Sequence, residues 1–238
     1  MSNLRIEEIS YITKKSYSED LELDEMNTQW KSGKFDDYQR TPDITTDIIL
    51  FHRIFPSKNG KQSLKGELCI LAGIWTKEWN GRNISGLTFI PGGHYERMGY
   101  RPSYLIKQGA DPKGDIDLYH ASKKELVEET GINSVKRLTP IAIIDIADND
   151  PRKHVFRSVF AGYTNKTVKP SEEIQVFYSI PVKDIEKVSR QGFITSAYKT
   201  DNGKTEFVKE KIEFVLNHDK MMKILLKLPK FNEYIREL

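Results

Sequence analysis

Three glutamates on one predicted helical turn are the residues whose types and spacing point most directly to chemistry. Glu125, Glu128 and Glu129 lie three and four positions apart, and Gly131 follows two positions after the last. On a helix these like charges face one another at a cost of roughly 0.2–0.5 kcal/mol per pair, and a helix ending at Gly131 crowds them at its negative end. Two readings are a solvated acidic face and a cation site. Since the cluster lacks His and Cys, a cation site here favours Mg²⁺ or Mn²⁺ over zinc.

A strand-like run that ends in glycines precedes this helix. Residues 87–90 are mostly apolar, and Pro91, Gly92 and Gly93 follow them, as expected where a strand stops and the backbone needs freedom. Together the two segments resemble the Nudix hydrolase family, whose box reads G-x5-E-x7-R-E-U-x-E-E-x-G-U, with U an aliphatic residue. The second half of the box fits Glu125, Leu126, Glu128, Glu129, Gly131 and Ile132, with Lys124 where the family has Arg and Gly93 as the first glycine.

The chain departs from the family pattern in the middle of the box. Lys124 lies 31 positions after Gly93, whereas the family pattern has 14, so about 17 residues are inserted. Gly99 occupies the ungapped position of the first Glu, which in the family braces the Arg. Asp115 or Asp117 could replace it, although Asp117 is also suited to cap the helix, and we prefer the cap.

The inserted stretch 97–114 has two readings. It carries four basic residues and two tyrosines, listed as Arg97, Arg101, Lys107, Lys113, Tyr100 and Tyr104. It is either a surface loop or a basic, aromatic lid beside a phosphate site.

Lys124, which stands where the family has Arg, raises a separate expectation, because Lys supplies charge without the planar fork of Arg. The orientation of Glu125 is therefore less well determined.

The resemblance implies a reaction and a set of site residues. Nudix hydrolases use a divalent cation, here Mg²⁺ or Mn²⁺, to let water attack a diphosphate bridge. The implied metal ligands are Gly93, through its carbonyl, Glu125, Glu128 and Glu129; the implied catalytic residues are Glu125, Glu129 and Glu173. Glu173 is chosen over Glu172 as a general base in a later loop, with an ordinary polar turn as the alternative.

Two short segments suggest the substrate. Residues 38–48 resemble the Y-x-R-P-x-x-T-x-D opening of ADP-ribose pyrophosphatase-like Nudix proteins and Nudix-related regulators, and residues 148–152 resemble their D-x-D-P-R segment. Arg40 and Arg152 could grip phosphates in bidentate fashion. Tyr38 is a candidate to stack on adenine, as are Phe35, Trp75 and Trp79, unless these aromatics are core or rim residues. ADP-ribose is the first expected substrate; triphosphates, dinucleotides and capped RNA use the same metal chemistry.

Composition agrees with a compact cytoplasmic enzyme. The chain has 238 residues, 38% of them hydrophobic and 30% charged. Its net charge of +3 is too small to indicate nucleic-acid binding by itself. Cys69, the only cysteine, excludes an internal disulfide and should be buried. Neither a secretory signal nor a long apolar stretch is visible, so neither export nor a membrane partner is expected.

The predicted elements alternate between strands and helices. Strands are expected over 44–51, 67–74, 86–90, 138–147, 154–163 and 174–180, with the first two as a hairpin, and helices over 117–130, 182–188, 206–217 and 220–228. This order predicts an α/β fold, and the resemblance sharpens it to a Nudix-type α/β/α sandwich with a mixed β-sheet and a loop-helix-loop box. The expected domains are an extension at 1–40, a Nudix domain at 41–190 and a C-terminal helical segment at 191–238.

A rival function is a sensor. A Nudix-like domain that binds ADP-ribose could use the lysine-rich C-terminal segment to contact DNA, as a transcriptional regulator does. In that segment lysines alternate with acids such as Asp201, Glu206 and Glu210, which gives no clean basic face. The enzyme is preferred because all three box carboxylates are present. The expected partner is a nucleotide-type small molecule rather than nucleic acid, and a homodimer is left open.

Overall fold

The fold is taken from a computed structural model of the chain. It describes residues 43–55, 57–58, 61–62, 66–79, 82–89, 91–94, 117–145, 155–168, 174, 176–201 and 203–238. The N-terminal extension 1–40 and the insertion 97–114 lie outside these ranges. Among the described helices, none is long and apolar enough to cross a membrane.

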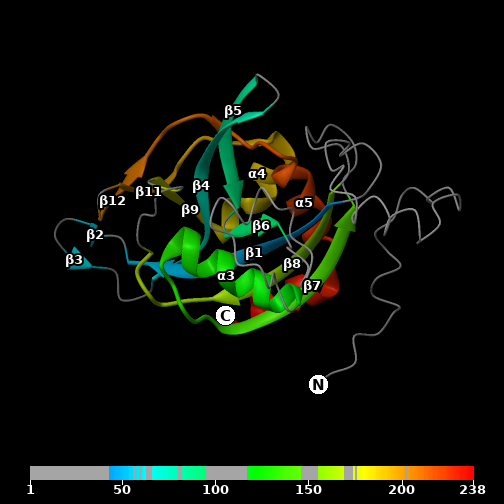
Figure 1. Cartoon of the computed structure of the whole chain (residues 1–238). Helices are drawn as coiled ribbons and strands as arrows, with labels where there is room; N and C mark the ends of the chain where they lie inside the picture. Colours follow the sequence, from blue (N-terminus) through cyan, green and yellow to red (C-terminus); the bar gives the residue numbers. More distant parts are fainter. Residues whose placement is uncertain are drawn as a thin grey trace, which may run out of the picture.

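The described elements form one large mixed sheet with helices on its faces (Figure 1). In chain order they are β1 (Asp43–Ile54), β2 (Ser57–Lys58), β3 (Lys61–Gln62), β4 (Glu67–Trp79), β5 (Arg82–Phe89), β6 (Gly92–His94), α3 (Leu118–Thr130), β7 (Lys136–Asp145), β8 (Val155–Tyr163), β9 (Val176–Pro181), η2 (Val182–Asp184), α4 (Ile185–Gln191), β10 (Phe193–Ile194), β11 (Ala197–Asp201), β12 (Lys204–Val208), β13 (Ile212–Glu213), α5 (His218–Leu225) and α6 (Pro229–Arg236).

The strand order is β12-β11-β9-β4-β1-β8-β7, with β5 on β4 and β6 on β1. β1 runs parallel to β8 and antiparallel to β4, which confirms the predicted hairpin. The two-stranded pairs β10-β13 and β2-β3 lie outside the large sheet. Every strand predicted from the sequence is present, and the α/β prediction is confirmed.

The alternation of side chains along β1 separates two layers of core. Ile48 and Leu50 point to one face and pack with Leu126 of α3. Ile49 and Phe51 point to the other face, where the buried side chains come from α4, α5 and α6. Figure 1 shows the same arrangement, with α3 across the near face and α4 and α5 behind the sheet. The chain is therefore layered helix, sheet, helix.

The C-terminal prediction was partly wrong. Residues 206–217, expected to be helical, instead include the end of β12 and all of β13. β11 and β12 form a hairpin that extends the large sheet through β9, and Gly203 in its turn has a φ of 76°. Along β12, Thr205 and Phe207 alternate with charged residues, which is the period of a strand. The helices predicted at 182–188 and 220–228 are confirmed as η2 with α4, and as α5.

Cys69 is fully buried, as expected. It lies on β4, and burial is the largest cause that raises the pKa of its thiol to about 12. The thiol is therefore protonated at neutral pH and behaves as a small apolar side chain.

His52 on β1 makes stability depend on pH. Its side chain is buried, and burial lowers its pKa from 6.5 to about 4. Between these values the unfolded chain binds a proton that the folded chain does not, so stability is lost as pH falls from 6.5 towards 4. We expect the free energy of unfolding of the wild type to fall by about 2–3 kcal/mol more than that of His52→Gln between pH 7 and 4.5, measured by urea unfolding. Parallel pH profiles for the two proteins would contradict this assignment.

Candidate active site

The acidic helix α3 has the boundaries that its sequence predicts. Asp117 precedes it in an extended conformation and accepts a hydrogen bond from the His120 N–H at 2.6 Å. Gly131 ends it with a φ of 66°, and its N–H donates to the Val127 carbonyl. Asp117 is thus the helix cap, as preferred from the sequence. The caps fix which side chains of α3 face the sheet.

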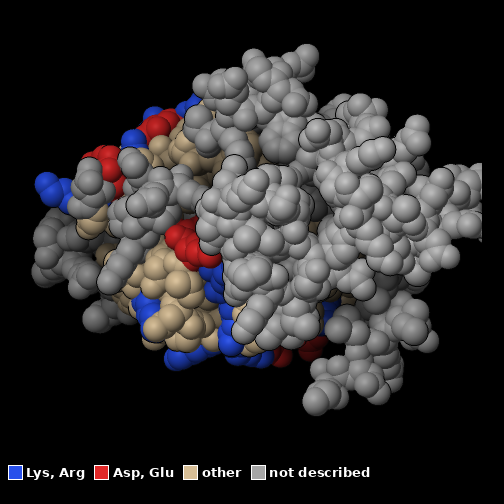
Figure 2. Space-filling view, viewed as in Figure 1, with Lys and Arg blue, Asp and Glu red and all other residues tan. Residues whose placement is uncertain are grey.

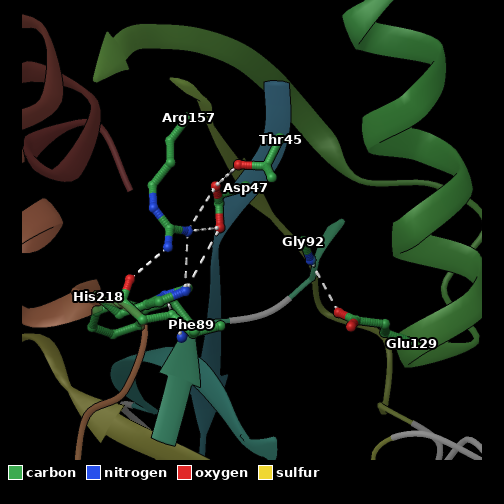
Figure 3. Close-up of polar contacts among 8 residues, drawn as sticks. Thr45, Asp47, Phe89, Gly92, Glu129, Arg157 and His218 are labelled. Carbon is green, nitrogen blue, oxygen red and sulfur yellow. Dashed lines mark hydrogen bonds and ion pairs between the residues drawn. The ribbon is translucent and has the colours of Figure 1, made fainter. Parts of the chain in front are cut away.

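Glu129 faces the sheet and is held by the glycine strand β6. Its side chain is only 5% exposed, and its Oε2 accepts a hydrogen bond from the Gly92 N–H at 3.0 Å. Figure 3 shows this carboxylate reaching from α3 to Gly92. A buried carboxylate needs such donors, so this contact fixes the distance between α3 and β6.

Glu125 lies against the next residue of the same strand. A Cβ built on Gly93 would stand 2.2 Å from Cδ of Glu125 and 2.3 Å from its Oε1. Only glycine leaves room for the carboxylate at this point. The Lys124 ammonium lies 3.9 Å from Glu125 Oε1, and an ammonium group cannot form the planar two-pronged pairing that Arg allows.

Glu128, by contrast, is exposed on the outer side of α3. Figure 2 shows acidic surface over α3 with basic side chains beside it. Within the described ranges, no group of three His, Cys, Asp or Glu side chains is close enough to hold a metal ion. The structure therefore brings Glu125 and Glu129 together at Gly92 and Gly93, and the complete set of metal ligands stays a prediction.

A buried ion pair, not assigned a role by the sequence, lies beside this site. Arg157 of β8 and Asp47 of β1 are 2% and 3% exposed, and Arg157 Nη1 donates to Asp47 Oδ1 at 3.0 Å. Arg157 Nη2 also donates to the Leu216 carbonyl, and Thr45 Oγ1 donates to Asp47 Oδ2 at 3.3 Å. The only sequence signal was that Thr45 and Asp47 form the T-x-D part of the segment 38–48.

His218, the first residue of α5, completes this buried network (Figure 3). Its Nδ1 accepts a hydrogen bond from the Phe89 N–H at 3.0 Å, so the proton of the neutral ring belongs on Nε2. Nε2 lies 3.9 Å from Asp47 Oδ1 and 3.2 Å from Arg157 Nη1. In this tautomer Nε2 and Nη1 both carry hydrogen, so they cannot bond to each other; Arg157 donates to Asp47, and the His218 ring lies near the same carboxylate.

The network supports β6 from the face opposite Glu129. Asp47 shares the face of Ile49, because successive side chains of β1 alternate. It is paired with Gly92 across the strands, and a Cβ on Gly92 would stand 2.9 Å from Asp47 Oδ1. The backbone of Gly92 thus lies between the buried ion pair and the carboxylate that it binds.

Several predicted site residues lie outside the described part of the chain, namely Tyr38, Arg40, Arg152, Glu173 and Asp115. The segments 148–152 and 169–173 also lie outside it. Their roles stay predictions from the sequence.

Several solved structures of Nudix proteins resemble the fold of this chain. A mutT/nudix family protein from Listeria innocua matches over 83% of this chain and 97% of its own, with 19% identity and a TM-score of 0.46. A MutT/nudix family protein from Enterococcus faecalis matches over 91% and 76%, with 15% identity and a TM-score of 0.43. The NUDIX domain of Shewanella oneidensis NrtR, solved with ADP ribose, matches over 67% and 86%, with 13% identity and a TM-score of 0.39.

These structural neighbours are Nudix proteins. No family model and no curated protein sequence matches the chain. Because the three TM-scores are below 0.5, the function of this chain has to be inferred from its own residues.

Proposed function

We propose that this protein is a Nudix-type pyrophosphohydrolase that cleaves the diphosphate bridge of a nucleoside diphosphate linked to another group, with ADP-ribose as the first substrate to test. The observation that carries the proposal is the placement of Glu125 and Glu129, one helical turn apart, against the consecutive glycines of β6. Two carboxylates in this arrangement are costly for a helix alone. A role in holding a cation explains why they are there.

The donors suit Mg²⁺ or Mn²⁺. Glu125 and Glu129 offer carboxylate oxygens only, and hard divalent cations prefer oxygen ligands and few protein contacts. Glu128 and the Gly93 carbonyl are proposed to complete the protein ligands. When bound, such a cation neutralises a diphosphate and lowers the pKa of a coordinated water.

The remaining roles fall to other residues of the chain. Glu173 is proposed to accept the proton of the attacking water. Arg40 and Arg152 are proposed to bind phosphate oxygens through their planar groups, and Tyr38 to stack on the base. Gly92 positions Glu129 through its N–H. The positive charge of Lys124 is proposed to influence the orientation of the Glu125 carboxylate.

The test is a substrate panel with the full chain. Purified protein is incubated with MgCl₂ or MnCl₂ and with ADP-ribose, sugar nucleotides, dinucleotides, nucleoside triphosphates or capped RNA, and the products are separated by ion-exchange chromatography. We expect metal-dependent release of two phosphate-bearing halves, AMP and ribose 5-phosphate in the case of ADP-ribose. Cleavage of triphosphates alone would reject ADP-ribose as the substrate. Tight binding of ADP-ribose without cleavage of any compound would reject the hydrolase function in favour of the sensor function.

Gly93→Ala tests the placement of Glu125. The new methyl group would occupy the space of the carboxylate, which is the flexible end of its side chain and can move away. We expect kcat to fall about 100-fold, as for other displacements of about 1 Å in an active site, while the free energy of unfolding falls by only about 1 kcal/mol. Gly162→Ala is the matched control, because its Cβ would meet Val135 at 3.4 Å, an ordinary contact. Equal activity of both variants would remove Glu125 from the site.

A further inference from the structure

A cleft of about 760 Å³ opens on the α3 face of the sheet, away from the acidic helix. Its walls come from the C-terminal end of β1, from β9, from the β11-β12 hairpin and from residues 163–168. We call it the His52 cleft, after the buried residue of β1 that lines it. Its volume is within the usual range for sites of small organic ligands.

The His52 cleft is distant from the proposed metal site. Thr46 of β1 is paired with Gly93, where Glu125 lies, and His52 is six residues further along the same strand. At about 3.3 Å per residue the two positions are about 20 Å apart. Neither Glu125 nor Glu129 lines the cleft.

Two exposed phenylalanines line the His52 cleft. Phe55 is 48% exposed and Phe207 is 53% exposed. Among the described residues, only three other large hydrophobic side chains are classed as exposed, namely Ile44, Tyr119 and Val127. Phe207 is held edge-on to Tyr198, with ring centroids 5.3 Å apart. Flat apolar faces at the rim of a cleft favour a ligand that carries a ring.

The polar groups of the cleft are mostly uncharged. Hydroxyls of Ser179, Thr200 and Thr205 lie along one wall, and the last two share a hydrogen bond of 2.9 Å. His52 is more than nine-tenths buried, and its Nε2 has no hydrogen-bond partner. Buried polar atoms are normally paired, and because this nitrogen is enclosed, a ligand hydroxyl would reach it only after a small shift of the ring. Burial keeps the ring neutral, since it lowers the pKa to about 4.

The two basic residues in the lining have partners elsewhere. Arg53 donates to the carbonyls of Gly66 and Leu238 at 2.8 and 2.9 Å. Lys166 donates to Asn133 Oδ1 at 2.6 Å and to Ser134 Oγ at 3.0 Å. The lining also includes Glu206, whose negative charge disfavours an anionic ligand. The described lining therefore suits an uncharged ligand that meets rings and hydroxyls, and it does not form a phosphate site.

We propose that the His52 cleft binds an uncharged ligand in which a ring carries several hydroxyl groups, of the kind found in nucleosides and glycosides. The rings of Phe55 and Phe207 contact the ring of the ligand, and the hydroxyl wall binds its polar edge. This site is separate from the proposed hydrolytic site and does not depend on a metal.

Calorimetric titration of the full chain in EDTA tests the proposal, with adenosine and methyl α-glucoside as probes. We expect saturable binding of one of them; binding of adenosine alone assigns the site to nucleosides, and binding of the glucoside alone assigns it to sugars. Phe207→Ala should weaken binding at least about fivefold, because one stacking contact is lost. Phe207 is half exposed, so the variant is expected to keep its fold, which circular dichroism checks.

Three further variants make the result decisive. Thr205→Trp fills the cleft from the edge hairpin and should abolish binding, whereas Tyr119→Ala removes an exposed ring on α3 outside the cleft and should not change it. Glu129→Gln should also bind normally. Absence of binding for both probes, binding that survives Phe207→Ala and Thr205→Trp, or loss of binding in Glu129→Gln would each overturn the proposal. A failure of hydrolysis leaves this measurement unaffected, because it is made without metal.

Discussion

Replacing Glu129 by Gln is expected to lower kcat/KM by about 10²–10⁴-fold, the range of losses typical for a residue that takes a direct part in the chemistry. The Gln side-chain carbonyl can still accept the hydrogen bond from the Gly92 N–H, so the link between α3 and β6 is kept. The negative charge is lost, and with it one ligand of the proposed cation. The loss should therefore appear in activity and not in the melting temperature.

Two measurements separate this expectation from a general defect. Glu129→Gln should bind Mn²⁺ more weakly than the wild type. Electron paramagnetic resonance measures this binding independently of turnover. Glu186→Gln is the matched control, because Glu186 is an exposed carboxylate of α4 whose partner in its own helix is Arg190 at 3.7 Å. Activity of Glu129→Gln within about twofold of the control would exclude Glu129 from the site.

Local signals explain why α3 could be predicted closely from the sequence. Its cap, Asp117, and its terminal glycine, Gly131, lie within a few positions of the backbone groups that they satisfy. The strands also carry local signals, in alternation and in β-branched residues. The prediction of a helix at 206–217 was wrong, because the alternating pattern there is short and contains many charged residues. A strand that pairs with a neighbour is decided by the sheet, not by its own residues.

The buried network could not be predicted for a different reason. Asp47 and Arg157 are 110 positions apart, and Arg157 and His218 are 61 positions apart. No spacing rule connects such residues, and only the parallel pairing of β1 with β8 brings the first two together. The motif around Thr45 and Asp47 was visible as a pattern, but its physical meaning required the fold. Glu125 and Glu129 were predictable because they lie on one turn.

Arg157→Met is the substitution with the largest expected effect on stability. It removes the charge that faces Asp47 and leaves a buried carboxylate without its main partner, which typically costs about 3–5 kcal/mol. The Leu216 carbonyl also loses a donor. We expect the free energy of unfolding from urea titration to fall by that amount with an unchanged dependence on urea, because the same surface is exposed on unfolding.

A double-mutant cycle distinguishes an ion pair from simple packing. Asp47→Leu alone leaves the Arg157 guanidinium buried without its carboxylate and should also destabilise strongly, whereas the double variant Asp47→Leu with Arg157→Met removes both charges. If the charges are the cause, the double variant should be more stable than either single variant, since a well-packed apolar pair often replaces a buried ion pair at little cost. Additive losses within about 0.5 kcal/mol would instead mean that the two side chains act independently.

The ion pair should also affect catalysis. Because Gly92 lies against Asp47 on one side and binds Glu129 on the other, the single variants should also lower kcat at temperatures where they remain folded. A loss of stability without any loss of kcat would mean that the ion pair stabilises the core but does not position the active site. The position of β6 would then depend on its strand pairing with β1 alone.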